Sequence, residues 1–334
     1  MRPPTAPMDS RPLVAILCLQ DSPHAEPEAS IERGIIGDAA EVRTFALPER
    51  PGADDFPAAV LNAAACIIWH SLPVDAALIG RLKNCRALIR NGVGFDSVDL
   101  RAAAARGLPV CNVPDYGTEE VADHALALTL ALCRQIASLD AEAKRLGWRI
   151  ECAPRLRRLS SLTFGIIGLG RIGTAAALRA KALGFRVIFF DPYAPPGTHK
   201  AVGIERVAAL PDLLARSDVI SVHCPLTPET RGFIGAAEIS QMKPSAYLVN
   251  TARGDIVQKA PVFAALRAGR LGGAGLDVVE NEPLRTPEEA ATPNLIVTCH
   301  AAFCSVEAMA EMRSTSARIA RAAVLGEPVW NRVN

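Results

Sequence analysis

Three side chains in the second half of the chain have the chemistry needed to handle a small organic acid. Arg253 carries a rigid, two-pronged guanidinium that can hold a carboxylate and polarise a neighbouring carbonyl. His300 carries an imidazole, a group that ordinarily titrates at about pH 6.5 and can give or take a proton at working pH. Glu282 could hydrogen-bond the second ring nitrogen of His300 and fix the ring. Together the three residue types predict acid–base chemistry on a carbonyl that lies beside a carboxylate.

A glycine-rich segment, FGIIGLGRIG at residues 164–173, predicts a nucleotide site. Gly168, Gly170 and Gly173 form G-x-G-x-x-G between a predicted strand and a predicted helix. The first glycine permits a tight turn, the second lets the backbone approach a pyrophosphate, and the third allows close packing of helix and strand. Amide groups at the start of the helix would face the phosphates, and Arg171 could add a direct contact.

A carboxylate at the end of the next predicted strand indicates which dinucleotide binds. Asp191 lies 18 positions after Gly173, where it would accept hydrogen bonds from the adenine ribose hydroxyls. Its charge would repel a 2′-phosphate, and Pro192 follows where an arginine could have bound one. We therefore expect NAD rather than NADP. Each of these residues alone is more often an ordinary turn or core residue, and it is their joint appearance at strand ends that favours function.

Short apolar runs alternate with helix-like segments, the pattern of parallel sheets with helices on both faces. In the first half we expect strands at 13–19, 42–45, 65–69, 87–90 and 109–112, and helices at 75–83 and 98–105. Thr118 is expected to cap one long helix over 118–145. In the second half we expect strands at 163–167, 186–190, 219–223, 247–250, 274–277 and 295–298, and a last helix at 305–325.

The predicted fold class is α/β, with two doubly wound parallel-sheet domains. Residues 10–115 would form a substrate domain that the C-terminal helix, within 301–330, completes. Residues 116–300 would form a Rossmann domain that binds the dinucleotide, and the Pro-rich residues 1–9 would be a disordered tail. We expect the active site in the cleft between the two domains.

Composition argues against several function classes. The 334-residue chain has a formal net charge of +1, so we expect no broad surface for nucleic acid or anionic membrane. No stretch approaches the roughly 20 apolar residues of a membrane span. Arg155, Arg157 and Arg158 form a basic cluster, but no aromatic platform accompanies it, which favours a solvated or subunit-facing segment. Nine cysteines are scattered without a C-x-x-C pair, which indicates a reducing cytoplasm and predicts no metal site.

Several further motifs carry a family resemblance. They are Asn91-Gly92-Val93-Gly94-Phe95-Asp96, LVNTARG at 248–254, GLDV at 275–278 with Glu282-Pro283, and His300-Ala301-Ala302. With the glycine motif they make the chain, from about residue 60 to 325, resemble the D-isomer-specific 2-hydroxyacid dehydrogenases. The segments 190–193 (FDPY), 223–226 (HCPL) and 300–303 (HAAF) look closest to the C-terminal-binding-protein branch, whose members include NAD(H)-binding transcriptional co-repressors as well as enzymes.

The resemblance implies a flavodoxin-like substrate domain, a Rossmann NAD-binding domain and a set of cofactor contacts. These contacts are Gly168, Gly170, Arg171, Ile172, Gly173, Asp191, His223, Cys224, Pro225, Thr230, Thr251, Ala252 and Asp277. Asp277 would meet the nicotinamide carboxamide. The resemblance also implies a homodimer made largely through the NAD-binding domains, with the long helix and the segment around Trp148 as contacts.

The substrate side leaves alternatives open. The loop Gly92-Val93-Gly94 could bind a carboxylate through free backbone N–H groups, although a plain tight turn is the competing interpretation. Arg90 could reach the same carboxylate or form a surface salt bridge. Phe303 would line the pocket where the co-repressors have a tryptophan, and Cys299 stands where a proline is common. His70 aligns with a pocket edge, but a lone histidine is more often structural.

The function that we expect is hydride transfer between NAD(H) and a small D-2-hydroxy acid or 2-keto acid, with a better competence for keto-acid reduction. One alternative is an NAD(H)-sensing interaction protein with weak dehydrogenase activity. Another is 3-phosphoglycerate dehydrogenase. The sequence leaves open which acid is the substrate and in which direction the reaction runs.

Overall fold

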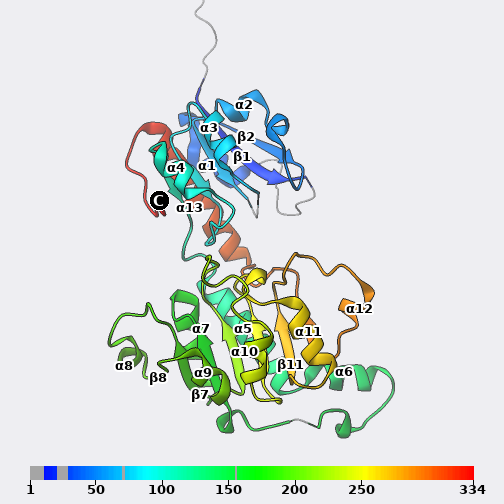
Figure 1. Cartoon of the computed structure of the whole chain (residues 1–334). Helices are drawn as coiled ribbons and strands as arrows, with labels where there is room; N and C mark the ends of the chain where they lie inside the picture. Colours follow the sequence, from blue (N-terminus) through cyan, green and yellow to red (C-terminus); the bar gives the residue numbers. More distant parts are fainter. Residues whose placement is uncertain (1–10, 21–28, 70–71, 155) are drawn as a thin grey trace, which may run out of the picture. The chain divides into compact units, whose positions relative to one another are not determined.

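The chain folds into two compact units. The computed structural model describes residues 11–20, 29–69, 72–154 and 156–334 (Figure 1). The terminal unit holds the residues up to Tyr116 together with Ser305–Asn334, and the central unit holds Gly117–Cys304. The chain thus changes unit at 116/117 and 304/305, where the sequence-based boundaries are 115/116 and 300/301. The expected tail at 1–9, and the predictions made for His70 and Arg155, fall outside the described residues.

A parallel sheet forms the centre of the terminal unit. Its described strands are β1 (Leu13–Leu19), β2 (Glu41–Leu47), β3 (Ala65–Ile68), β4 (Leu88–Arg90) and β5 (Val110–Cys111), in the order β2-β1-β3-β4-β5. Its helices are α1 (Ser30–Ile36), α2 (Ala58–Leu61), α3 (Ala76–Arg81), α4 (Leu100–Ala105) and α13 (Val306–Leu325). The inner strands β1 and β3 are buried on both faces, which explains their unbroken apolar sequences. Helix α13 begins at a Ser305 cap and ends at Gly326 in the left-handed region.

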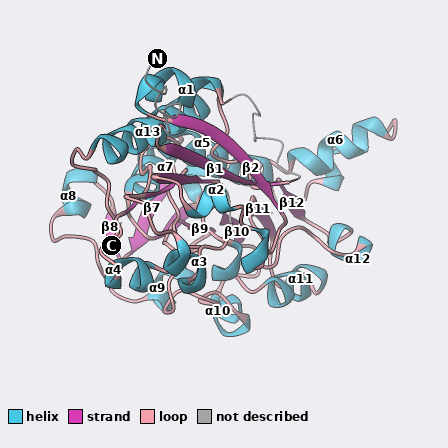
Figure 2. Cartoon of the chain, turned by 90° about the horizontal axis from the view of Figure 1, so that it is seen from above, coloured by secondary structure: helices cyan, strands magenta, loops and turns pink. Residues whose placement is uncertain are grey.

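A second parallel sheet forms the centre of the central unit. Its described strands are β6 (Thr163–Ile167), β7 (Arg186–Phe190), β8 (Glu205–Arg206), β9 (Val219–Val222), β10 (Tyr247–Asn250), β11 (Gly273–Leu276) and β12 (Leu295–Val297), in the order β12-β11-β10-β9-β6-β7-β8 (Figure 2). Its helices are α5 (Thr118–Cys133), α6 (Ile136–Lys144), α7 (Arg171–Ala182), α8 (Thr198–Val202), α9 (Leu210–Arg216), α10 (Ala236–Gln241), α11 (Lys259–Arg267) and α12 (Pro287–Ala290).

The two faces of this sheet bury different helices because alternate strand residues point to opposite sides. On β9, Ile220 and Val222 belong to the core under α9, α10 and α11. The neighbouring Val219 belongs to the core on the other face, under α5 and α7. Every residue of β9, β10 and β11 is buried, so these strands can carry side chains to a fixed place at their carboxyl ends.

The long helix predicted over 118–145 is wrong in its middle. It is two helices, α5 and α6, separated by Gln135 in the left-handed region (φ 49°). Helix α5 lies close against β11, because a Cβ at Gly275 would be only 3.0 Å from Cβ of Leu128. After Cys133 this packing ends, and Ile136 is already exposed. The predicted cap at Thr118 is also wrong, since Gly117 is the N-cap residue.

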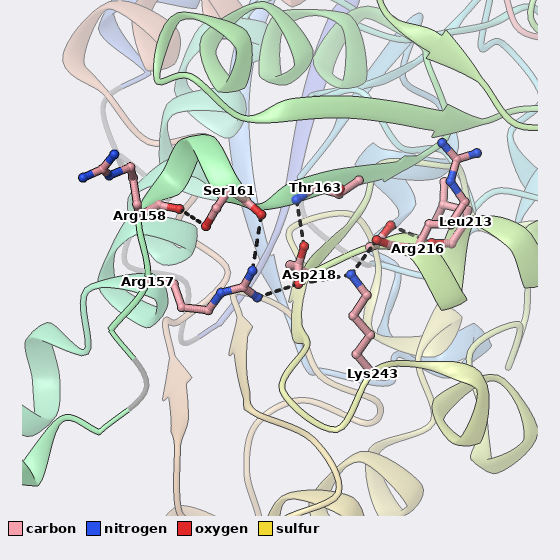
Figure 3. A network of polar contacts seen from close by, with 9 residues as sticks. Arg157, Arg158, Ser161, Thr163, Leu213, Arg216, Asp218 and Lys243 are labelled. Atoms are coloured by element: carbon pink, nitrogen blue, oxygen red, sulfur yellow. Dashed lines mark hydrogen bonds and ion pairs between the residues drawn. The ribbon is translucent and has the colours of Figure 1, made fainter.

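The amino-terminal edge of the central sheet is held by one buried carboxylate (Figure 3). Asp218 accepts from the Thr163 amide at 2.9 Å and forms ion pairs with Arg157 at 2.9 Å and Lys243 at 3.1 Å. Burial alone would raise the pKa of Asp218, but the Thr163 amide and the two cations outweigh that effect and lower it. The network joins the segment before β6 to β9 and to the turn before β10.

The α/β class with two parallel sheets is confirmed, and the predicted strands fall on observed ones. The sequence-based assignment misses the two-residue strand β8 and the short helices α1 and α2, and it gives no bounds for α8, α9, α10, α11 and α12. Among the helices of the described residues, none combines the length and the apolar character that crossing a bilayer requires.

Candidate active site

The candidate site lies at the carboxyl edge of the central sheet. Because the strands are parallel, the segments that follow β6, β7, β9, β10, β11 and β12 all emerge at this edge. They carry the glycine loop, Asp191, His223, the Arg253 loop, Asp277 and His300 in that order. Backbone hydrogen bonds tie the last three together: the Asp277 amide donates to Asn250 O at 3.0 Å and the His300 amide donates to Asp277 O at 2.8 Å.

The glycine loop packs closely at two of its three glycines and is open at the third. Gly168 has φ 91°, and a Cβ there would lie 2.6 Å from the amide nitrogen of Cys224. A Cβ at Gly173 would lie 2.1 Å from the carbonyl oxygen of Gly168, so helix α7 could not pack as it does. A Cβ at Gly170 would meet no atom of the described residues within 4 Å. The protein's own packing thus explains the first and third glycines, and the second faces open space in front of the N-terminus of α7.

Asp191 organises two loops at once. Its carboxylate accepts from the Leu169 amide at 2.8 Å, from the Tyr193 amide at 2.8 Å and from the Ala194 amide at 3.1 Å. A carboxylate offers about four lone-pair sites, so these bonds leave room for a further donor such as a ribose hydroxyl. The sequence-based prediction includes only that further contact. The structure adds the role of joining the glycine loop to the turn after β7.

Two buried polar atoms near this edge mark places where a ligand could supply a partner. Within the described residues, neither Nδ1 of His223 nor Oγ1 of Thr251 has a hydrogen-bond partner. Nε2 of His223 lies 2.8 Å from the Ser221 hydroxyl, and burial lowers the pKa of His223 to about 4, so the ring is neutral near pH 7. Burial also raises the pKa of the adjacent Cys224 to about 11, which keeps its thiol protonated.

The residues of the β9 loop and of the glycine loop are therefore compatible with a bound NAD. Thr230 fixes the β9 loop, because its hydroxyl donates to Pro225 O at 2.7 Å. The open face of Gly170 and the unpartnered His223 and Thr251 atoms are what a bound dinucleotide would complete. Arg171 and Ile172 are the first two residues of helix α7, and Ala252 lies in the turn after β10.

The loop that carries Arg253 is shaped by Asn250. This side chain is fully buried; its oxygen accepts from the Ala252 amide at 3.0 Å, and its nitrogen donates to Arg253 O at 2.9 Å. The guanidinium of Arg253 donates to Ala252 O at 2.7 Å and is partly exposed. The next residue, Gly254, touches the loop after β11: a Cβ there would lie 2.0 Å from the carbonyl oxygen of Val279. The arginine loop is therefore pressed against the segment that leads to Glu282.

His300 and Glu282 form the predicted pair. Nδ1 of His300 lies 2.9 Å from Oε2 of Glu282, and the side chains are 39% and 38% exposed. Nε2 of His300 is then the ring nitrogen that remains for a substrate. His300 has φ 54°, an unusual backbone conformation for a non-glycine residue that its surroundings must hold in place. The Phe303 ring lies edge-on to the imidazole, with centroids 6.4 Å apart.

A buried network under His300 provides that support. The Asp277 side chain is 1% exposed and accepts from the Ala301 amide at 2.9 Å and the Ala302 amide at 3.0 Å. The Thr298 hydroxyl donates to the same carboxylate at 2.6 Å, so its oxygen is left to accept from Nε2 of His124, 2.9 Å away. The Asp277 carboxylate thus anchors the backbone that follows His300 and the Thr298 side chain that precedes it. This positioning role is additional to the nicotinamide contact that the resemblance implies for Asp277.

Sequence reasoning misses several members of this site. Asn250 lies in the LVNTARG motif without a predicted role, and His124 and Thr298 belong to none of the motifs. His124 belongs to α5, more than a hundred residues before Thr298, so only the fold brings them together. One available signal is that a lone histidine within the apolar stretch of α5 needs a polar partner.

The expected substrate loop of the terminal unit differs from its prediction in one respect. The Gly92 amide is not free for a ligand, because it donates to Arg90 O at 2.9 Å. Gly92 has φ 142°, and a Cβ there would collide with the Arg90 guanidinium, which itself donates to Asn91 O. The Val93 carbonyl accepts from Asn112 at 2.8 Å. These bonds favour a tight turn closed by its own hydrogen bonds over an anion-binding nest that uses the Gly92 amide.

Comparisons with known proteins decide the family. The sequence model of the D-isomer specific 2-hydroxyacid dehydrogenase family, NAD binding domain, matches residues 126–302, more than half of the chain. The chain belongs to this family. Its cofactor is accordingly NAD, as the carboxylate at Asp191 predicts.

Proteins similar to the chain are known in sequence and in structure. A D-3-phosphoglycerate dehydrogenase of Mycobacterium bovis is 38% identical over 299 residues, which are 90% of this chain and 56% of the relative. The chain thus spans little more than half the length of the curated relatives it matches. A D-lactate dehydrogenase of Aquifex aeolicus, solved with NAD and lactic acid, has a TM-score of 0.83 at 27% identity, over 94% of this chain and 96% of that one. The TT0316 protein of Thermus thermophilus has a TM-score of 0.80 at 32% identity, over 96% of this chain and 100% of that one.

Proposed function

We propose that this family member catalyses hydride exchange between NAD(H) and a small D-2-hydroxy acid or 2-keto acid. The observation that carries the proposal is the joining of three loops at one sheet edge. Gly254 packs the loop that carries Arg253 against the Val279 segment, and Glu282, three residues further along that segment, hydrogen-bonds His300. Backbone bonds through Asp277 link His300 to the end of β10. The glycine loop emerges at the same edge.

The residues divide the chemistry among themselves. A bound NAD would supply the hydride chemistry, as acceptor in oxidation of the alcohol and, in its reduced form, as donor in reduction of the carbonyl. Arg253 holds the substrate carboxylate and polarises the carbonyl. In reduction, Nε2 of His300 gives its proton to the carbonyl oxygen, while Nδ1 stays bonded to Glu282. In oxidation, the same nitrogen takes the proton from the hydroxyl.

Features of the structure support the predicted cofactor contacts more than the predicted substrate contacts. We propose that Gly170, Arg171 and Ile172 hold the pyrophosphate, that Asp191 holds the adenine ribose, and that His223 and Thr251 bond the nicotinamide half. Open space at Gly170 and the unpartnered atoms of the last two support this assignment. The substrate contacts expected at Arg90, Gly92, Val93, Gly94 and Phe303 stay predictions.

The substrate class has a second candidate. Identity of 38% to a D-3-phosphoglycerate dehydrogenase over 90% of this chain favours 3-phosphoglycerate as an alternative to a lactate-like acid. A phosphate-bearing substrate would need additional cations around the pocket mouth. A panel that contains pyruvate, phenylpyruvate and 3-phosphohydroxypyruvate separates a small, an aromatic and a phosphorylated substituent.

The finer resemblance to the co-repressor branch stays a hypothesis. It depends on three short segments, at 190–193, 223–226 and 300–303, whereas the relatives described above carry phosphoglycerate dehydrogenase and lactate dehydrogenase names. We propose catalysis rather than NADH sensing as the main role, because sensing has no evident need for an acid and its orienting carboxylate. A sensor would change its oligomeric state or partner binding with NADH while turnover stays negligible.

We also propose a homodimer formed through the central unit. The segment after α6 exposes three apolar side chains: Leu146 is 96% exposed, Trp148 92% and Ile150 75%. Apolar side chains of this size exposed together favour a protein partner. The cytoplasmic location expected from the cysteine pattern stays a prediction.

The test is NADH consumption by the purified chain with the keto-acid panel. We expect substrate-dependent loss of NADH absorbance with at least one member, and its disappearance in His300→Ala. The matched control is His199→Ala, which removes another imidazole of the central unit outside the catalytic loops. Absence of turnover with every member, or turnover that survives in His300→Ala, would contradict the proposed chemistry.

A further inference from the structure

One aromatic side chain beside the nucleotide loops is exposed and yet held in place. Tyr193 is 79% exposed, two residues after Asp191. Its hydroxyl donates to Oε2 of Glu229 at 2.7 Å, and this bond to a carboxylate raises the pKa of Tyr193. The hydroxyl therefore stays protonated, and able to donate, across the neutral pH range. The Tyr193 ring is therefore exposed to solvent and yet held at its hydroxyl end by a hydrogen bond.

The backbone that carries Tyr193 is fixed from two sides. The Asp191 carboxylate accepts from the Tyr193 and Ala194 amides and also from the Leu169 amide of the glycine loop. Arg206 of β8 donates to Asp191 O at 2.9 Å and to Ala194 O at 3.2 Å. The turn after β7 is thus rigid, and the ring leaves it in a set direction.

The order of strands in the sheet shows that the Tyr193–Glu229 hydrogen bond crosses the carboxyl end of one strand, β6. Strand β6 lies between β9 and β7, and the glycine loop leaves the carboxyl end of β6. Tyr193 follows β7, and Glu229 belongs to the loop after β9. Neighbouring strands are about 4.8 Å apart, so these two loops are rooted about 10 Å from each other on opposite sides of β6. The bond therefore spans the carboxyl end of β6, on the side where Asp191 is placed to meet the adenine ribose.

We propose that Tyr193 is the stacking surface for the adenine ring of the dinucleotide and that Glu229 is a positioning residue that holds the tyrosine ring over the end of β6. This inference rests on the NAD binding of the proposed function. Every base presents a flat π face, and an aromatic ring accepts it without reading its hydrogen-bonding edge. Tyrosine suits the place because its ring is apolar while its hydroxyl can be anchored.

The test measures binding of adenine-containing ligands without turnover. Dissociation constants of ADP-ribose and AMP are measured by calorimetry for the wild type, Tyr193→Ala, Tyr193→Phe, Glu229→Ala and the Tyr193→Phe/Glu229→Ala pair. Tyr193→Ala should weaken both ligands about five- to a hundredfold, the range that base stacking on an aromatic side chain spans. Tyr193→Phe keeps the ring and should lose only about two- to fivefold. Glu229→Ala should match it, and the pair should lose no more than either alone.

The matched control is Trp330→Ala, which truncates another exposed aromatic ring (43%) in the terminal unit and should leave both constants unchanged. Because Tyr193 is exposed, its variants should keep the wild-type Tm. Equal affinity of Tyr193→Ala and wild type would overturn the proposal, as would a loss in Tyr193→Phe as large as in Tyr193→Ala. An unaffected Glu229→Ala would remove its positioning role. A wild type that binds neither ligand would instead count against the proposed function itself.

Discussion

Alanine at position 254 tests whether the contact between two loops sets the catalytic geometry. A Cβ at Gly254 would lie 2.0 Å from the Val279 carbonyl oxygen and 2.8 Å from the amide nitrogen of Glu280. Real Cβ atoms essentially never come closer than 3.0 Å to another heavy atom, and here the obstacle is backbone, which cannot rotate away. The Arg253 loop and the segment before Glu282 must therefore separate by about 1 Å.

The size of the effect follows from that separation. A displacement of about 1 Å in a catalytic arrangement can cost on the order of 10²-fold in rate. We therefore expect Gly254→Ala to lower kcat/KM with the best keto acid about a hundredfold, equivalent to about 2.7 kcal/mol of transition-state stabilisation. Overpacking of this kind also costs about 1–3 kcal/mol of folding stability, so the Tm of the central unit should fall by about 2–12 °C.

The assay combines steady-state kinetics with calorimetric binding of ADP-ribose, which should stay at the wild-type value because the glycine loop is untouched. Gly80→Ala is the matched control: it adds the same methyl group where no atom of the described residues lies within 4 Å, and should leave kcat/KM unchanged. A folded Gly254→Ala protein with wild-type kcat/KM would refute the reasoning. An equal loss of ADP-ribose affinity would show general damage to the unit instead.

Three further predictions concern the network under His300, the buried carboxylate at the other sheet edge and the proposed dimer. Thr298→Val removes the hydroxyl between His124 and Asp277. A buried polar group that loses its partner costs about 1–3 kcal/mol, so kcat and Tm should both fall, whereas Thr298→Ser should retain both. A wild-type kcat in the valine variant would contradict the positioning role. The lowered pKa of Asp218 means that its ionised form stabilises the fold above its unfolded pKa of about 4 and that this contribution is lost as the pH falls through the folded pKa. The Tm gap between wild type and Asp218→Asn should therefore be large at neutral pH and shrink below about pH 4, and a constant gap would argue against the ion pairs. Trp148→Ser should shift sedimentation from dimer to monomer, with Trp330→Ala as the control and an unchanged mass as the contrary result.

The sequence was sufficient where a local pattern has one physical explanation. The spacing of Gly168, Gly170 and Gly173 after an apolar strand predicts the nucleotide loop, because few other arrangements need glycine at all three places. The pairing of Glu282 with His300 was also predictable, since a catalytic imidazole needs an orienting partner. Both predictions use residues that are near each other in the chain or carried by a motif.

The rest depends on contacts between distant parts of the chain. Nothing local ends α5 at Cys133, because Gln135 is a good helix former; the helix stops where it leaves β11. The Gly92 amide looks available from its glycine-rich surroundings, and only the turn shows that Arg90 O accepts from it. The bond between His124 and Thr298 joins two segments that no periodicity relates.

The central claim is that His300 and Arg253 support hydride transfer to the carbonyl carbon of a 2-keto acid. Its most direct test is a single turnover with NADH that carries deuterium at the transferable position of the nicotinamide ring, followed by analysis of the product. We expect the label at C2 of a D-2-hydroxy acid with the wild type, and no labelled product with His300→Ala although that variant still binds ADP-ribose. Label that stays in the cofactor, or an L product, would contradict the account.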